Sequence, residues 1–160
     1  MNDLSVATAP RLVPVDRSYT TSFVVDQSPE EVFAAINNVR AWWTGDITGS
    51  TDRLGEEFTY RYADIHRSTQ RITELVPGRK VVWLVTDGYL SFVADKAEWT
   101  GTTMVFDIAS KAGKTELRFT HIGLLAGNEC YDSCSSAWGS LIDTSLRNLI
   151  TTGKSGLDRL

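Results

Sequence analysis

Five consecutive stretches of the chain alternate between apolar and polar residues, and this alternation limits the fold more than any other feature. The stretches cover residues 56–63, 66–75, 79–86, 102–109 and 115–122. Successive side chains of a strand point to opposite faces, so each stretch is typical of a half-buried β-strand. Pro77-Gly78 and the segment 111–114 are turn sequences between neighbouring stretches. The sequence therefore predicts a meander of antiparallel hairpins.

One face of the predicted sheet is rich in bulky aromatic side chains, whereas the reverse face is polar and carries Glu116, Arg118 and Thr120. The aromatic face includes Phe58, Tyr60, Tyr62, Trp83, Phe106, Phe119 and His121. A sheet with one apolar face must bury that face against a second layer.

The C-terminal part of the chain supplies this second layer. From Glu129 onward, apolar residues recur at helical spacing, among them Cys130, Cys134 and Trp138. The pattern predicts a helix of about five turns that ends at residues 151–152, with Gly153 as the terminating residue.

The N-terminal part predicts one strand and one or two short helices. Residues 19–25 suit a first strand, and Ser28-Pro29-Glu30-Glu31 has the pattern of a helix start with a capping box. We expect Trp42-Trp43 to lie in a short second turn or helix before a loop over 45–53. Residues 87–101 are less regular, and we expect either a short extra strand or an apolar flap there.

These elements predict an α+β fold, in which a curved antiparallel sheet of six to seven strands wraps around the long C-terminal helix. A strongly twisted sheet curves away from a straight helix, so space tends to remain between the two. That space is the predicted binding site, because ligand pockets are mostly apolar with a few polar groups. The polar groups expected in that space are Tyr60, Tyr62, His66, His121 and Ser145. For His66, which lies near a strand start, an exposed position is the alternative.

Length and composition predict one domain with short extensions. The chain has 160 residues, 42% of them hydrophobic, which is enough for one well-packed core. We expect a flexible N-terminal arm over 1–16, a ligand-binding domain over 17–153 and a C-terminal tail over 154–160.

Charge and hydropathy narrow the range of partners and locations. A net charge of −4 with scattered lysines and arginines argues against nucleic acid. The chain has neither a signal-peptide pattern at its start nor an apolar run long enough for a membrane span, so we expect a cytoplasmic protein without a membrane partner. Reduced cysteines are the default in that compartment.

Several local features, taken in order, resemble the START-related helix-grip (SRPBCC) superfamily, and specifically its Aha-type branch, the proteins like the activator of a heat-shock-protein ATPase. The features are the opening 23–33, the Trp42-Trp43 pair, the segment 119–124 and the ending 138–153. The resemblance implies the helix-grip fold. It leaves the activity open, because the superfamily includes carriers, cyclases, hydrolases and co-chaperone domains.

Our first hypothesis is a binding module, and not an enzyme, for a small hydrophobic or amphipathic molecule held between the sheet and the C-terminal helix. No cofactor is expected. The predicted ligand-binding residues are Trp42, Trp43, Tyr60, Tyr62, Trp83, Phe106, Phe119, His121, Cys134 and Trp138.

A second hypothesis makes the same cavity the active site of a cyclase or hydrolase. His121 would act as the acid or base, with Tyr60 or Tyr62 assisting, since an imidazole is suited to proton transfer near neutral pH. A histidine that only forms hydrogen bonds in the core is the commoner case.

Two further interpretations concern metals and partners. Cys130, Cys134 and His121 resemble part of a soft-metal site, but structural zinc takes four ligands, so we expect buried thiols and no metal. An exposed apolar flap over 89–92 would suit a co-chaperone-like interaction module. The sequence is also compatible with a symmetric homodimer.

Overall fold

The computed structural model describes residues 17–156 and contains one seven-stranded antiparallel sheet. The order of the strands across the sheet is β1-β7-β6-β5-β4-β3-β2. The strands are β1 (Ser18–Val25), β2 (Asp46–Gly49), β3 (Glu57–Tyr62), β4 (His66–Val76), β5 (Lys80–Leu90), β6 (Thr103–Lys111) and β7 (Lys114–Leu125). The predicted meander is therefore confirmed, and the closing pair β1–β7 joins the first strand to the last.

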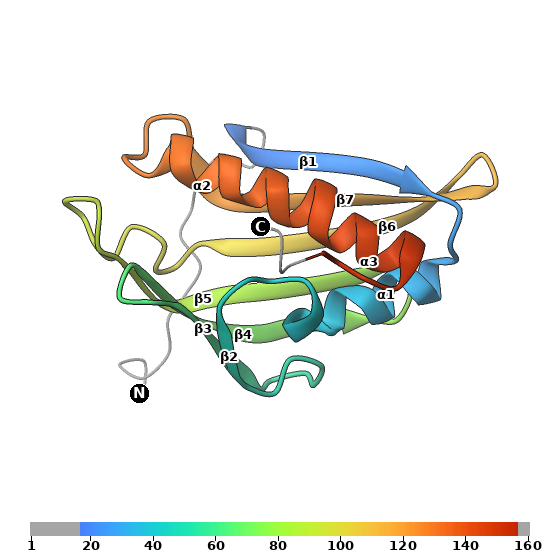
Figure 1. The fold of residues 1–160 in the computed structure, drawn as a ribbon, viewed down its shortest axis with the longest axis horizontal. Helices are drawn as coiled ribbons and strands as arrows, with labels where there is room; N and C mark the ends of the chain where they lie inside the picture. Colours follow the sequence, from blue (N-terminus) through green and yellow to red (C-terminus); the bar gives the residue numbers. More distant parts are fainter. Residues whose placement is uncertain (1–16, 157–160) are drawn as a thin grey trace, which may run out of the picture.

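The C-terminal helix lies across the inner face of this sheet (Figure 1). It consists of α2 (Tyr131–Trp138), the π-helical segment η4 (Gly139–Leu146) and α3 (Arg147–Thr152). It ends at Gly153, whose φ of 84° is left-handed, as predicted. The α+β helix-grip architecture predicted from the sequence is thus confirmed.

A short helical segment connects β1 to the rest of the sheet. Helix α1 (Pro29–Asn37) begins with the predicted capping box: the Ser28 hydroxyl accepts from the Glu31 N–H, and the Glu31 carboxylate accepts from the Ser28 N–H. The 3-10 turn η3 (Val39–Ala41) follows and leads into Trp42-Trp43. The buried Ser145 hydroxyl of η4 donates to the Trp42 carbonyl oxygen at 2.6 Å, which ties the C-terminal helix to this connection.

Two segments differ from the sequence-based expectation. The predicted loop over 45–53 contains β2, which pairs with β3 along Ile47 and Tyr60. Its four residues follow Gly45 and end at Gly49, both of which have positive φ, so the strand is too short to show an alternating pattern. In 87–101, strand β5 continues to Leu90 because it pairs with the start of β4, and turns follow up to the buried Trp99.

The predicted domain boundaries stay predictions, because the structure describes residues 17–156 only. The predicted arm over 1–16 and the last residues of the tail, 157–160, lie outside the described residues. Among the described helices, none combines the length and the apolar character that a membrane crossing requires.

Candidate functional site

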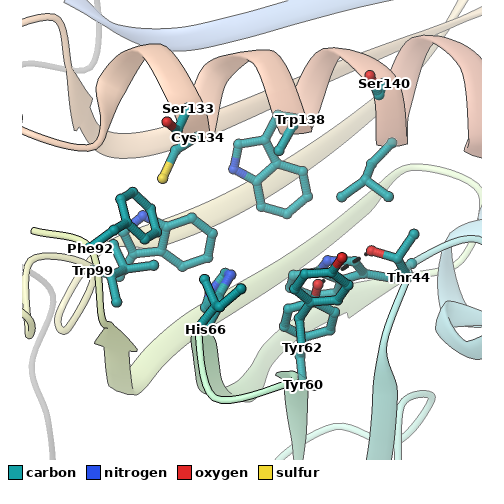
Figure 2. A pocket seen from close by; sticks show the side chains of 15 residues that line it. Thr44, Tyr60, Tyr62, His66, Phe92, Trp99, Ser133, Cys134, Trp138 and Ser140 are labelled. Atoms are coloured by element: carbon teal, nitrogen blue, oxygen red, sulfur yellow. Dashed lines mark hydrogen bonds between the residues drawn. The ribbon is translucent and has the colours of Figure 1, made fainter. Parts of the chain in front are cut away.

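A pocket with a volume of about 510 Å³ opens between α2 and the sheet, at the end where the β3–β4 hairpin and the loop after β5 approach the helix (Figure 2). Its size lies within the range that is usual for small-molecule sites. The lining residues are Trp43, Thr44, Tyr60, Tyr62, Ile65, His66, Leu90, Phe92, Trp99, Ser133, Cys134, Ala137, Trp138, Ser140 and Leu141.

Stacked aromatic rings form much of the pocket wall. The indole of Trp43 stacks on the ring of Tyr60 with centroids 4.3 Å apart, and Trp99 lies parallel to Trp138 at 6.0 Å. Both tryptophans of the second pair are buried, at 4% and 1% exposure. Flat, rigid faces of this kind suit a planar guest, because they offer contact area without loss of side-chain entropy.

The mouth of the pocket is also apolar. Tyr62, Ile65 and Phe92 are exposed by 50%, 44% and 48%, and all three line the opening. On the helix side the mouth is bordered by small residues, among them Ser133, Ala137 and Ser140. An exposed apolar rim around a concave site is typical of a binding surface.

Thr44 and Tyr60 form a polar corner at one end of the pocket. Their hydroxyl oxygens lie 3.3 Å apart in a hydrogen bond (Figure 2). Burial raises the pKa of the Tyr60 phenol above its usual value, so the group is neutral at physiological pH.

His66 places the second polar group in the pocket. Its imidazole makes edge-to-face contacts with Tyr60 on one side, at 5.0 Å, and with Trp99 on the other, at 4.5 Å. The Nε2 atom is buried and has no hydrogen-bond partner among the described residues. Desolvation lowers the pKa of His66 to about 4, so the ring is neutral at pH 7. The side chain is half-buried and lines the pocket, as expected for a polar group of the cavity, and the alternative of an exposed His66 is wrong.

Cys134 contributes a thiol to the helix side of the pocket, one helical turn from Cys130. Both cysteines are buried and free. The hydrogen bond to Cys134, together with burial, raises the pKa of the Cys130 thiol, which keeps it protonated. Within residues 17–156, no three His, Cys, Asp or Glu side chains are grouped closely enough to hold a metal ion.

The structure divides the predicted site residues into two groups. Trp43, Tyr60, Tyr62, Cys134 and Trp138 are brought together in the pocket lining. Trp42, Trp83, Phe106, Phe119 and His121 are outside the lining and are 0% exposed. The rings of Trp83 and Phe106 lie 4.8 Å apart and both pack against Trp42, in the connection after α1. The rings of Phe119 and His121 pack against Trp138 of the C-terminal helix, at 4.5 and 5.9 Å. This part of the interior is packed core.

His121 is held within that core by a chain of hydrogen bonds. The Trp138 indole N–H can only donate, and it lies 3.0 Å from Nδ1 of His121, which must therefore accept. A neutral imidazole then carries its proton on Nε2, which donates to the Thr102 hydroxyl at 2.8 Å; that hydroxyl donates in turn to the Trp99 carbonyl oxygen. Both ring nitrogens are engaged by the protein. This geometry does not favour His121 as an acid or base toward a substrate.

The pocket lining also includes residues outside the predicted set of ligand-binding residues, from the connection after α1, the β3–β4 hairpin, the end of β5 with the segment after it, and the C-terminal helix. They are Thr44, Ile65, His66, Leu90, Phe92, Trp99, Ser133, Ala137, Ser140 and Leu141. Of these, His66 is one of the polar groups expected in the cavity. Leu90, Phe92 and Trp99 belong to the segment 87–101, and its apolar and aromatic content was the signal that could have identified them.

The sequence profile of the family described as "Activator of Hsp90 ATPase homolog 1-like protein" matches residues 26–151. No curated protein matches the sequence.

Solved structures share the fold at low sequence identity. The Aha1 dimer from Colwellia psychrerythraea is 23% identical, with 86% of this chain and 98% of that chain covered and a TM-score of 0.68. Protein MLL2253 from Mesorhizobium loti is 14% identical, with 79% and 92% covered and a TM-score of 0.64. CalU16 from Micromonospora echinospora is 16% identical, with 91% and 84% covered and a TM-score of 0.59.

Proposed function

Because the chain belongs to the family of activator of Hsp90 ATPase homolog 1-like proteins, whose fold holds a helix against a curved sheet, we propose that it binds a small, mainly apolar molecule in the pocket between them. The observation that carries the proposal is the combination of a volume of about 510 Å³ with walls of stacked aromatic rings. A filled core would have no such space, whereas a polar surface cleft would have no such walls.

Ligand-induced stabilisation tests this proposal. A panel of fatty acids, sterols and aromatic compounds is added to the protein, and the melting temperature is recorded. A ligand at one hundred times its dissociation constant adds about 2.7 kcal/mol to the free energy of unfolding. Binding should also change the tryptophan fluorescence, since Trp43, Trp99 and Trp138 line the pocket.

A matched pair of helix variants ties any binding to the pocket. Ala137 and Ser136 are adjacent, exposed residues of α2, but only Ala137 lines the pocket. Ala137→Trp places a large ring in the mouth and should weaken binding at least about tenfold, whereas Ser136→Trp should leave it unchanged. Equal affinities in the two variants, or no stabilisation by any compound of the panel, would contradict the proposal.

Location and oligomeric state stay predictions. The cytoplasm is the expected compartment, and a homodimer is one of the oligomeric states that the sequence allows. The similar structure from Colwellia psychrerythraea is that of a dimer, and light scattering on the purified protein measures the corresponding mass for this chain.

A further inference from the structure

The lining of the pocket carries no formal charge at neutral pH. None of its residues, all of which belong to the described part of the chain, is a lysine, arginine, aspartate or glutamate. Tyr60 and His66 are neutral there, because burial raises the pKa of the phenol and lowers that of the imidazole. A buried carboxylate or ammonium group of a ligand would therefore find no opposite charge, and burying an unpaired charge is costly.

Two polar side chains, Tyr60 and His66, lie inside the pocket, whereas the sheet side of its mouth is mainly apolar. The exposed residues on this side of the rim are Tyr62, Ile65 and Phe92, and Ser133 and Ser140 border the helix side. Inside, the imidazole of His66 faces the space below the helix (Figure 2), and its Nε2 has no hydrogen-bond partner among the described residues. A ligand would thus meet its hydrogen-bonding partner at the inner end of the pocket.

The inward face of β4 continues this polar character into the core. Ser68 and Gln70 follow His66 at two-residue spacing, and both are 0% exposed. The Ser68 hydroxyl and both polar atoms of the Gln70 amide also have no partner within residues 17–156. The three residues form a polar row on β4, of which His66 is the member that lines the pocket. Buried polar groups normally have partners, so the unpartnered Nε2 of His66, the one member of the row that lines the pocket, is where a guest can supply a hydrogen bond.

The orientation of His66 is fixed before any ligand binds. Its ring is in edge-to-face contact with Tyr60 and Trp99, at interplanar angles of 71° and 86°. Side-chain rotation is therefore restricted on both sides, and little conformational entropy is lost when a ligand bonds to the ring. A fixed imidazole selects ligands by the direction of their hydrogen bonds, since one ring nitrogen accepts a hydrogen bond and the other donates one.

We propose that the pocket selects uncharged aromatic molecules with a hydroxyl group, bound with the hydroxyl inward on the His66 imidazole and the apolar rings toward the mouth. This inference rests on the proposed function and adds a ligand class and an orientation to it. A hydrocarbon of the same shape leaves the imidazole unpaired, and the corresponding carboxylate brings an unpaired charge into the pocket.

Three compounds with one ring system test the inference: 2-naphthol, naphthalene and 2-naphthoate. Each is titrated into the ¹⁵N-labelled protein at pH 7, and amide chemical shifts give the dissociation constants. We expect 2-naphthol to bind about tenfold more tightly than naphthalene, as one net hydrogen bond in a buried site allows. We expect 2-naphthoate to be the weakest of the three. His66→Phe, which keeps a planar ring between Tyr60 and Trp99, should remove the preference for 2-naphthol over naphthalene. His66→Gln, which restores a hydrogen-bonding group, should recover part of it.

The outcomes separate the two proposals. If naphthalene binds as tightly as 2-naphthol, if 2-naphthoate binds most tightly, or if His66→Phe keeps the preference while its amide spectrum shows a folded protein, the inference is wrong and the proposed function stands. If none of these compounds and none of the wider panel shifts the signals of pocket residues, the proposed function is wrong.

Discussion

The interior contains two regions with one histidine each, and the two histidines are in opposite situations. His121 lies in the sealed core, where both of its ring nitrogens have protein partners. His66 lies in the pocket, where Nε2 has no partner among the described residues. Trp99 stands between them, in edge-to-face contact with His66 at 4.5 Å and with His121 at 4.8 Å. Trp99 thus separates a histidine that is hydrogen-bonded within the core from a histidine that borders the pocket.

The largest expected effect on stability comes from replacing His121 by leucine, and the same replacement of His66 is the comparison. His121→Leu leaves the buried Trp138 N–H without an acceptor and Thr102 without its donor, so we expect a loss of about 3 kcal/mol in the free energy of unfolding. His66→Leu removes a buried nitrogen that has no protein partner, so stability should change by less than about 1 kcal/mol. Urea denaturation of both variants measures the difference. Equal losses would show that the two regions do not differ in this way.

Acid should destabilise the protein through His66. Its pKa is about 4 in the folded protein and 6.5 when exposed, so the unfolded chain binds the proton first as the pH falls. The stability contributed by neutral His66 is complete above pH 6.5 and is lost between pH 6.5 and 4, by roughly 2 to 3 kcal/mol. The test compares urea denaturation of the wild type and His66→Leu across this window. The variant should lose less stability than the wild type, and parallel curves would contradict the buried, neutral state of His66.

A smaller effect is expected from Thr102→Val, a change of similar volume. The valine cannot accept the Nε2–H of His121, although the Trp99 carbonyl oxygen keeps its bond from the backbone N–H of residue 102. We expect a loss of about 1 to 2 kcal/mol. Ligand binding should persist, because Thr102 is outside the pocket lining. Loss of binding with full stability would reverse the roles that we assign to the two regions.

The sequence predicted the fold well because the fold depends on patterns that are local. Alternation identified the strands of the meander, and the capping box at Ser28 and the terminating Gly153 marked helix ends that the structure confirms. Strand β2 escaped prediction because its four residues, the last of which is Gly49, carry too little pattern. The end of β5 escaped it because its partner in β4 is distant in the sequence.

The candidate site was predictable only as a face of the sheet. Alternation places Tyr60 and Phe106 on the same inner surface, but it cannot indicate that Tyr60 borders open space while Phe106 is covered. That distinction depends on where the helix, the connection at Trp42-Trp43 and the loop around Trp99 fill the interior. His66 and His121 illustrate the limit, since only their neighbours in space decide which one faces a guest.

The most direct test of the whole account is the position of a bound ligand relative to the two histidines. Intermolecular nuclear Overhauser effects from bound 2-naphthol to the imidazole protons of His66 and His121 provide this position, because they arise only between protons that lie close together in space. We expect nuclear Overhauser effects from the ligand to His66 and to side chains of the pocket such as Trp99, and none to His121. Effects to His121 or Phe119 in place of His66 would show that a ligand occupies the region described here as sealed core, and would contradict it.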